Sequence, residues 1–206
     1  MGKLTPTQNM IIDASLELFA NVGYKETTFK RIAEKSGVKR NSIKSVFASK
    51  QEILLSILDK YKHNSTGREI LDKKDNDEFL EPIFFLETFA EDLIILWNSR
   101  NEKRFIRIVL REQFAADKNC TMEIKDIVNE LRSIWWMIFD EMINAGIICN
   151  ENPLHLAEQF INPLFMIRLE YLTSEDEDNL QISVSKAVKH VKFFCTKLDL
   201  NHNDEQ

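Results

Sequence analysis

The sequence predicts an all-α protein with about nine helices. Apolar residues recur at helical spacing along most of the chain, and no segment shows the strand alternation bounded by hairpin turns. The five glycines and four prolines are scattered between these periodic segments and do not gather in a flexible linker. With 44% apolar residues among 206, the chain is able to bury a substantial core.

The first four predicted helices are short and fall in the first third of the chain. They span about residues 6–22, 28–35, 39–46 and 50–61, each with apolar residues on one face. Gly23 and Gly37 follow the first two at positions where a helix ends in a left-handed residue. Short helices bury little surface alone, so Leu16, Phe19 and the fourth helix are expected to complete a common core.

The later helices are longer and are predicted near 78–98, 103–116, 121–145, 153–173 and 178–198. Gly146 stands where the third of these ends, and Asn152-Pro153 supplies an N-cap followed by proline at the first helical position. Pro163 falls inside the fourth and is expected to bend it. Charged residues interrupt every apolar stretch, which excludes a membrane span and, with no signal peptide at the N-terminus, predicts a cytoplasmic protein.

Charge divides the chain into two parts. Residues 1–50 carry nine basic and four acidic residues, a balance of +5, while the remaining 156 carry 18 basic and 29 acidic residues, a balance of −11. Such asymmetry is typical of a protein in which one part meets a polyanion. We therefore expect residues 1–50 to form a domain that binds nucleic acid and residues 51–206 to form a second, helical domain.

Residues 28–47 read as two short helices joined by a turn. Ile32 and Val38 are expected to pack on Ile43 and Val46, and Gly37 supplies the positive φ of a sharp turn. The exposed face of the second helix then presents cations and hydrogen-bonding groups suited to the major groove, although a basic helix is often simply solvated. These residues are Lys39, Arg40, Asn41, Lys44 and Ser45.

Residues 14–55 resemble the N-terminal signature of the tetracycline-repressor (TetR) family of transcriptional regulators. The matching pairs occur in the family's order over about 42 residues: Leu18-Phe19, Gly23-Tyr24, Thr27-Thr28, Ile32-Ala33, Gly37-Val38, Phe47 and Ser49-Lys50. The resemblance implies a helix-turn-helix regulator, in which Lys39, Arg40 and Asn41 open the recognition helix. It also implies that Thr28 caps the preceding helix and touches a phosphate, that Lys30 lies near the DNA backbone or the groove edge, and that Lys50 contacts a phosphate.

Two positions depart from the family's pattern. Asn41 stands where the family often has glycine, and Lys44 stands where it usually has tyrosine. Lys44 keeps a phosphate contact by charge, whereas Asn41 is able to pair with adenine in a way that glycine cannot. The mode of binding is therefore expected to persist, with the DNA sequence left open.

The second domain is rich in aromatic residues, which favour either an ordinary core or an apolar pocket for a small-molecule effector. The candidate pocket residues are Phe85, Phe89, Trp97, Phe105, Phe114, Trp135 and Phe139. Neighbours on a helix lie roughly 100° apart, so only one of Trp135 and Trp136 is expected to point inward. Arg104, Arg107 and Arg111 share a face that either orients a ligand, is solvated or contacts the first domain.

The last two helices carry apolar residues at steps of three and four, the seam of packed helices. The residues are Leu164, Ile167, Tyr171, Val184, Val188, Val191, Cys195 and Leu198. In the TetR family these helices form a four-helix dimer interface, and a homodimer is what a near-palindromic DNA site requires. An intramolecular seam is the alternative.

No motif indicates an enzyme, a cofactor or a metal site. The four histidines are isolated, and His155 with Glu151 or Glu158 is at most half of a metal site. Cys120, Cys149 and Cys195 are expected to be reduced thiols, with Cys120 the one candidate for a redox role because polar residues precede it. The sequence thus predicts a DNA-binding regulator released by a small apolar or amphipathic ligand, with repression favoured by the family; a DNA-associated architectural protein without ligand control is the alternative.

Overall fold

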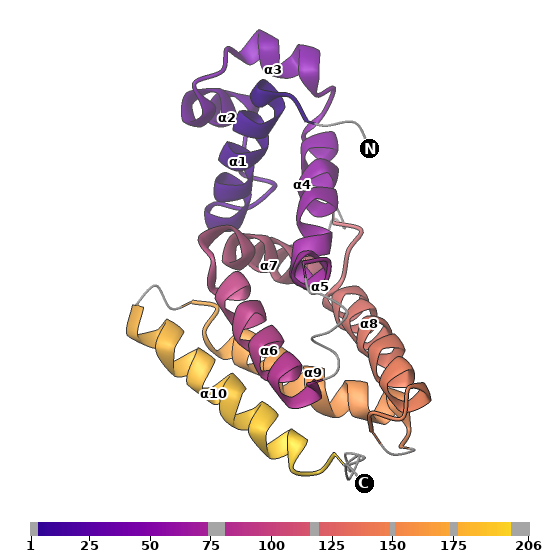
Figure 1. Ribbon diagram of the computed structural model, residues 1–206. Helices are drawn as coiled ribbons and strands as arrows, with labels where there is room; N and C mark the ends of the chain where they lie inside the picture. The colour runs from indigo at the N-terminus through magenta and orange to yellow at the C-terminus, as the bar shows by residue number, and fades with distance from the viewer. Residues whose placement is uncertain (1–3, 74–80, 116–119, 149–150, 174–176, 199–206) are drawn as a thin grey trace, which may run out of the picture. The chain divides into compact units, whose positions relative to one another are not determined.

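The structure, a computed structural model, describes residues 4–73, 81–115, 120–148, 151–173 and 177–198. Within these ranges it contains ten helices and no strand, which confirms the predicted all-α class (Figure 1). Nine helices correspond to the predicted ones, with boundaries that differ by a few residues. The tenth, α5 (Arg68–Leu71), is a single turn that the sequence pattern did not reveal.

The helices gather into two compact units. The first consists of Met1–Ser65 with Arg100–Ile124, and the second of Thr66–Ser99 with Lys125–Gln206. The chain therefore leaves the first unit after its fourth helix, returns to it for one further helix, and leaves again. No helix in the described part of the chain has the length and apolar character needed to cross a membrane.

The first unit holds α1 (Pro6–Asn21), α2 (Phe29–Ser36), α3 (Arg40–Val46), α4 (Lys50–Ser65) and α7 (Arg100–Gln113). A capping box fixes the start of α1, since the Thr5 hydroxyl accepts from the Gln8 amide and the Gln8 side chain accepts from the Thr5 amide. The predicted core residues Leu16, Phe19 and Ile32 are buried. Contacts of α1 with α2, α4 and α7 make it the central helix of the unit.

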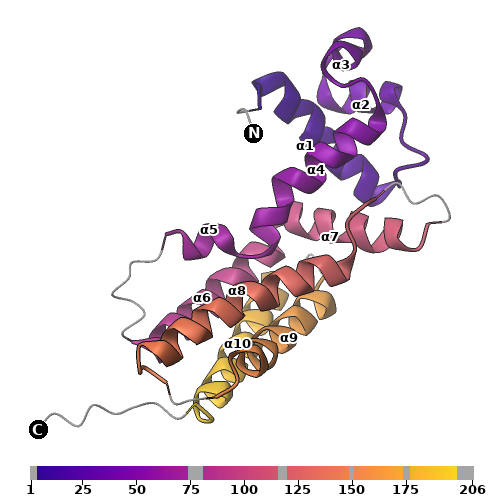
Figure 2. The same cartoon turned by 90° about the vertical axis from the view of Figure 1, so that its right-hand side faces the viewer.

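The second unit is built around α6 (Pro82–Asn98), α8 (Ile124–Asn144), α9 (Pro153–Glu170) and α10 (Glu177–Cys195) (Figure 2). Asn152 caps α9 as predicted, with its side-chain oxygen accepting from the amides of Leu154 and His155. The helix continues without a break through Pro163. Helix α10 packs along both α6 and α9, and aromatic side chains fill the space between α6, α8, α9 and α10.

Two predictions about burial are wrong. Phe114, which we placed in the pocket, follows the last residue of α7 and leaves 81% of its surface exposed. Cys120, the one candidate for a redox role, which requires an exposed thiol, is buried, and burial raises the pKa of its thiol, which keeps it protonated. Cys195 is buried as well, with a pKa raised by burial to about 11, and Cys149 lies outside the described residues.

Candidate nucleic-acid interface

Helices α2 and α3 form a helix-turn-helix whose ends are locally determined. The Thr28 hydroxyl accepts from the Arg31 amide at 3.3 Å and so caps α2 at its start. At the other end Gly37 has φ of 70°, and its amide donates to the Ala33 carbonyl at 3.0 Å. Ile32 and Ile43 are fully buried between the helices. The turn and the capping residue are thus as the sequence predicted.

The outer face of α3 is cationic and open. Lys39, Arg40, Asn41, Lys44 and Ser45 are all exposed. Among the residues that the structure describes, no acidic side chain lies within ion-pair distance of Lys39, Arg40 or Lys44. Ser45 donates its hydroxyl hydrogen to the Ser42 carbonyl at 2.9 Å, which leaves its lone pairs free to accept. The face therefore offers three cations that no described carboxylate neutralises.

Thr28 and Lys30, the two predicted DNA contacts in the first turn of the helix-turn-helix, are both exposed. Thr28 is exposed at the start of α2 while its oxygen serves as the cap. Lys30, also exposed, has its ammonium 3.9 Å from the carboxylate of Glu34 one turn along the helix. An exposed pair of this kind is weak, about 0.3–0.5 kcal/mol, so the ammonium is able to exchange Glu34 for a phosphate.

Lys50, for which the resemblance implies a phosphate contact, is bonded to backbone carbonyls within the protein. Its ammonium donates to the carbonyl oxygens of Tyr24 at 2.6 Å, Thr27 at 2.7 Å and Lys25 at 3.3 Å. It also lies 4.4 Å from the centre of the Tyr24 ring. Burial lowers the pKa of this ammonium, while the carboxylate of Glu26 opposes the shift. In this structure Lys50 ties the α1–α2 connection to the start of α4, a role that the motif alone did not indicate.

The aromatic residues of the second unit form one packed cluster. Of the candidate pocket residues, Phe85, Phe89, Trp135 and Phe139 meet there, and Phe160 and Phe194, which we had not placed in the pocket, complete it. The Trp135 ring centre lies 4.3 Å from that of Phe160 and 4.7 Å from that of Phe89. Trp135 is buried and Trp136 is 43% exposed, as the spacing predicted.

The Trp135 indole carries a polar atom into this cluster. Its Nε1 atom is buried, and no acceptor in the described part of the protein bonds to it. A buried donor without an acceptor costs about 1–3 kcal/mol. The cluster is thus apolar apart from one N–H group that an acceptor would stabilise.

The remaining candidate pocket residues lie elsewhere. Trp97 is buried in the second unit against Phe165, with the Arg168 guanidinium 4.7 Å above its ring. Phe105 belongs to the first unit, where its ring stacks on Tyr61 with centroids 5.8 Å apart. Phe105 and the exposed Phe114 are therefore removed from the group of pocket residues.

The apolar seam of α9 and α10 packs inside the protein. Leu164, Ile167, Val191, Cys195 and Leu198 are buried within the second unit, which corrects their assignment to a subunit interface. Periodic spacing identified a packed seam, but α6 and α9 of the same chain cover it. Tyr171 is half-buried, with the Lys186 ammonium 5.0 Å from its ring.

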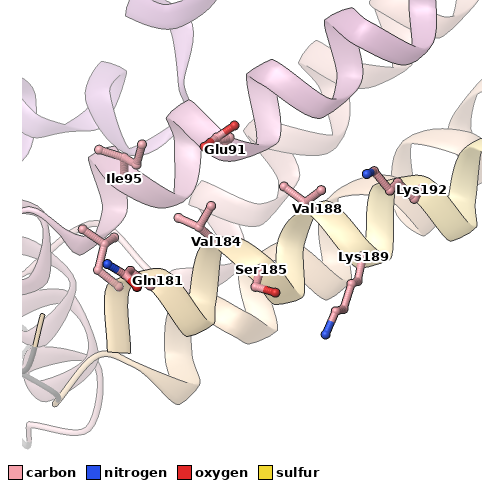
Figure 3. A pocket seen from close by; sticks show the side chains of 9 residues that line it. Glu91, Ile95, Gln181, Val184, Ser185, Val188, Lys189 and Lys192 are labelled. Carbon is pink, nitrogen blue, oxygen red and sulfur yellow. The ribbon is translucent and has the colours of Figure 1, made fainter. Parts of the chain in front are cut away.

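Val184 and Val188 are half-buried in a hollow of about 560 Å³ that α6 and α10 line together. Both point from α10 toward the α6 side, where Glu91 and Ile95 stand, whereas Lys189 points away (Figure 3). A second hollow, of about 480 Å³, opens between α9 and α10 beside His155, His190 and Phe193. The outward surface of these two helices carries exposed apolar side chains: Leu154, Met166, Ile182 and Phe193.

In the described ranges, a helix-turn-helix with an exposed cationic recognition helix and a second helical unit define a DNA-binding regulator. Residues 11–57, which include α2, α3 and their turn, match the family described as bacterial regulatory proteins, tetR family. The match confirms, for this segment, the resemblance to the tetR family that its motifs carry.

Relatives extend the similarity beyond the helix-turn-helix. The chain is 25% identical over 162 residues to an uncharacterized HTH-type transcriptional regulator, YvkB, of Bacillus subtilis, covering 79% of this chain and 81% of the relative. It is 24% identical over 165 residues to the fatty acid metabolism regulator protein of the same organism, covering 78% and 80%. The structure of a SmeT–triclosan complex matches 96% of this chain and 94% of that one with a TM-score of 0.73 at 16% identity, which shows a shared fold.

Proposed function

We propose that the protein is a homodimeric repressor that binds a near-palindromic DNA site through α3 and is released from it by a small apolar or amphipathic effector. In this proposal residues 1–50 are the DNA-binding domain, residues 51–206 sense the effector and pair the subunits, and the protein acts without catalysis in the cytoplasm, where bacterial operators lie. The carrying observation is the exposed face of α3, whose Lys39, Arg40 and Lys44 no carboxylate of the described residues neutralises.

The DNA-binding proposal is tested with duplexes selected by the purified protein from a randomised library. A two-fold symmetric sequence with half-sites about one helical turn apart is expected, because a symmetric dimer places two recognition helices in successive major grooves. A library that shows no enrichment after repeated rounds would overturn the proposal.

Lys44→Ala tests whether α3 contacts phosphates. Loss of one ammonium from the backbone contacts should weaken binding to all duplexes and reduce the slope of log affinity against log salt by about one. Lys62→Ala, an exposed lysine on α4, is the control and should leave the slope unchanged. An unchanged slope for Lys44→Ala would remove it from the interface.

Asn41→Ala tests base reading by the start of α3. An asparagine that pairs with adenine fixes one base, at about 1–3 kcal/mol of discrimination. The variant should therefore select duplexes with relaxed preference at one position of each half-site. Equal weakening on every duplex would instead assign Asn41 to backbone contacts.

The aromatic cluster of the second unit supports an apolar effector that carries a hydrogen-bond acceptor. Once the packed rings separate to admit it, such a molecule would accept from the buried Trp135 N–H and stack on Phe89 and Phe160. The name of one relative, a regulator of fatty acid metabolism, and the triclosan complex of a protein with the same fold suggest fatty acyl compounds and triclosan as probes.

The effector proposal is tested by titrating oleic acid, oleoyl-CoA and triclosan into the complex with a selected duplex. At least one should release DNA and change tryptophan fluorescence, and Trp135→Phe should weaken that response while DNA binding persists. Trp136→Phe, at an exposed neighbouring position, is the matched control. If none of the three compounds changes DNA binding, the result would favour the alternative, an architectural protein without ligand control.

A further inference from the structure

One carboxylate in the first unit joins three helices. Glu17 on α1 accepts from Lys35 of α2 at 2.5 Å through one oxygen and from Arg104 of α7 at 2.7 Å through the other. The Arg104 side chain is only 13% exposed and that of Glu17 26%. The hydrogen bond from Lys35, aided by the charge of Arg104, lowers the pKa of Glu17 although burial opposes the shift, so the group is ionised near neutral pH.

Lys35 stands where a small displacement of α2 has consequences for DNA reading. It lies in the last turn of α2, two residues before Gly37, whose left-handed backbone turns the chain into α3. A cation at this end of a helix is also favoured by the helix dipole. Holding Lys35 against α1 therefore fixes the end of α2 from which the recognition helix starts.

Helix α7 touches the same part of the first unit a second time. Two turns after Arg104, the Arg111 guanidinium lies so close to Gly23 that a Cβ added there would meet it at 3.0 Å, with the Glu26 carboxylate at 2.8 Å. Gly23 and Glu26 belong to the α1–α2 connection. Arg104 and Arg111 of α7 thus lie against α1 and the α1–α2 connection, which supports a contact of this face with the helix-turn-helix segment.

We propose that Glu17 is a positioning residue that links α7 to the helix-turn-helix, so that the placement of α3, and with it DNA affinity, depends on the Arg104–Glu17–Lys35 bridge. The inference rests on the proposed function for its DNA readout alone. The bridge itself is a statement about the first unit and is open to measurement without DNA.

The test compares Arg104→Gln, Glu17→Gln and the double variant in the full chain. Arg104→Gln should weaken binding to a duplex selected by the unaltered protein by roughly fivefold, the lower end of typical coupling between sites. Hydrogen exchange of the α2 amides should become several-fold faster. In the Glu17→Gln background the second substitution should add no further loss, because both variants break the same bridge.

Two controls separate positioning from general damage. Arg104→Lys keeps a cation opposite Glu17 and should restore most of the affinity and the α2 protection. Asp13 lies one turn before Glu17 on α1, and its carboxylate is 3.0 Å from the Lys60 ammonium of α4. Asp13→Asn breaks this ion pair and should leave the exchange of the α2 amides unchanged. Helix content by circular dichroism should match that of the unaltered protein in every variant.

Unchanged hydrogen exchange of the α2 amides in Arg104→Gln would overturn the inference. It would also be overturned if the losses of DNA affinity in the two single variants multiplied in the double variant. If the unaltered protein selects no duplex, the proposed function fails, while the exchange experiment still decides whether Glu17 positions α2.

Discussion

Lys50 shows how one side chain takes a role that its motif does not specify. Its ammonium donates to three backbone carbonyls of the α1–α2 connection and lies over the Tyr24 ring. A charged donor shared by carbonyls is among the stronger hydrogen bonds in proteins. The ammonium has only three N–H donors. If it donates to all three carbonyls, it has no hydrogen left to donate to a phosphate.

Lys50→Met separates the two roles. If the ammonium holds the carbonyls of Tyr24 and Thr27, the variant should lose about 1–3 kcal/mol of stability in urea unfolding, and the salt slope of DNA binding should stay the same. Lys50→Arg should recover only part of that stability, because a planar guanidinium fits three converging carbonyls less well than an ammonium does. Unchanged stability with a salt slope reduced by one would return Lys50 to the phosphate contacts.

At the level of single residues, the sequence predicted what local chemistry determines. Thr28 and Asn152 accept hydrogen bonds from backbone amides of the next few residues, and Gly37 supplies the left-handed backbone of a turn. Their roles therefore follow from the neighbouring sequence. Depth in the fold depends on distant segments, and for that reason the sequence misplaced Phe114 and Cys120. The Lys50 and Glu17 contacts, with partners 18 to 87 residues away, gave no signal in the pattern.

At the scale of elements, the turn between α2 and α3 depends on a backbone that only glycine adopts easily. Gly37 has φ of +70°, and nothing lies within 4 Å of the position of an added Cβ. Gly37→Ala should therefore cost only the backbone strain, about 1–2 kcal/mol. Gly23→Ala, at φ of +108°, also requires the ends of the Glu26 and Arg111 side chains to shift and should cost slightly more.

Urea unfolding of both variants measures these costs, with Gly2→Ala near the N-terminus as the control. Equal costs at the two glycines would contradict the close packing of Arg111 on the α1–α2 connection. A larger cost at Gly37 would mean that the turn carries contacts beyond its own backbone.

The seam between α9 and α10 should make stability depend on pH. His190 of α10 has its Nε2 atom 3.1 Å from the Phe160 carbonyl, and burial lowers the pKa of its imidazole below the usual 6.5. The unfolded chain therefore binds a proton at a higher pH than the folded chain does. The stability that this neutral histidine contributes is present above pH 6.5 and is lost as the pH falls from there toward the lowered pKa.

His190→Gln should flatten this part of the profile. Thermal unfolding at several pH values between 7.5 and 5 should show a smaller decrease in melting temperature for the variant than for the unaltered protein. His155→Gln, at an exposed position on α9, serves as the comparison. A His190→Gln profile parallel to that of the unaltered chain would show that other groups cause the pH dependence.

Helix existence was the most predictable feature of the elements, because nine amphipathic segments each bury a stripe. Helix α5 escaped because four residues are too few to show a period. The steps of three and four along α10 correctly indicated packing, but the pattern contains no information about which chain provides the other side. The structure assigns that side to α6 and α9 for the buried members of the seam.

At the scale of the whole molecule, the two units each bury their own core, so pairing of two chains must use side chains that the protomer leaves uncovered. On α9 and α10 these include Met166 and Phe193, which are 58% and 65% exposed. Burying a large apolar side chain contributes about 1.5–3 kcal/mol. A symmetric interface repeats every contact, so each such residue contributes twice.

Phe193→Glu is therefore expected to convert the proposed dimer to a monomer while the protomer stays folded. The phenyl ring is mostly exposed, so the protomer core loses little, whereas a dimer would bury a charge on each side of its axis. Sedimentation equilibrium should show a weaker self-association by at least tenfold, with binding to the symmetric duplex reduced in parallel. Phe114→Glu makes the same change at a still more exposed ring of the first unit and should leave self-association as it was. A Phe193→Glu protein that remains fully dimeric would exclude this part of α10 from the interface, and equal effects of both substitutions would indicate a general loss of stability.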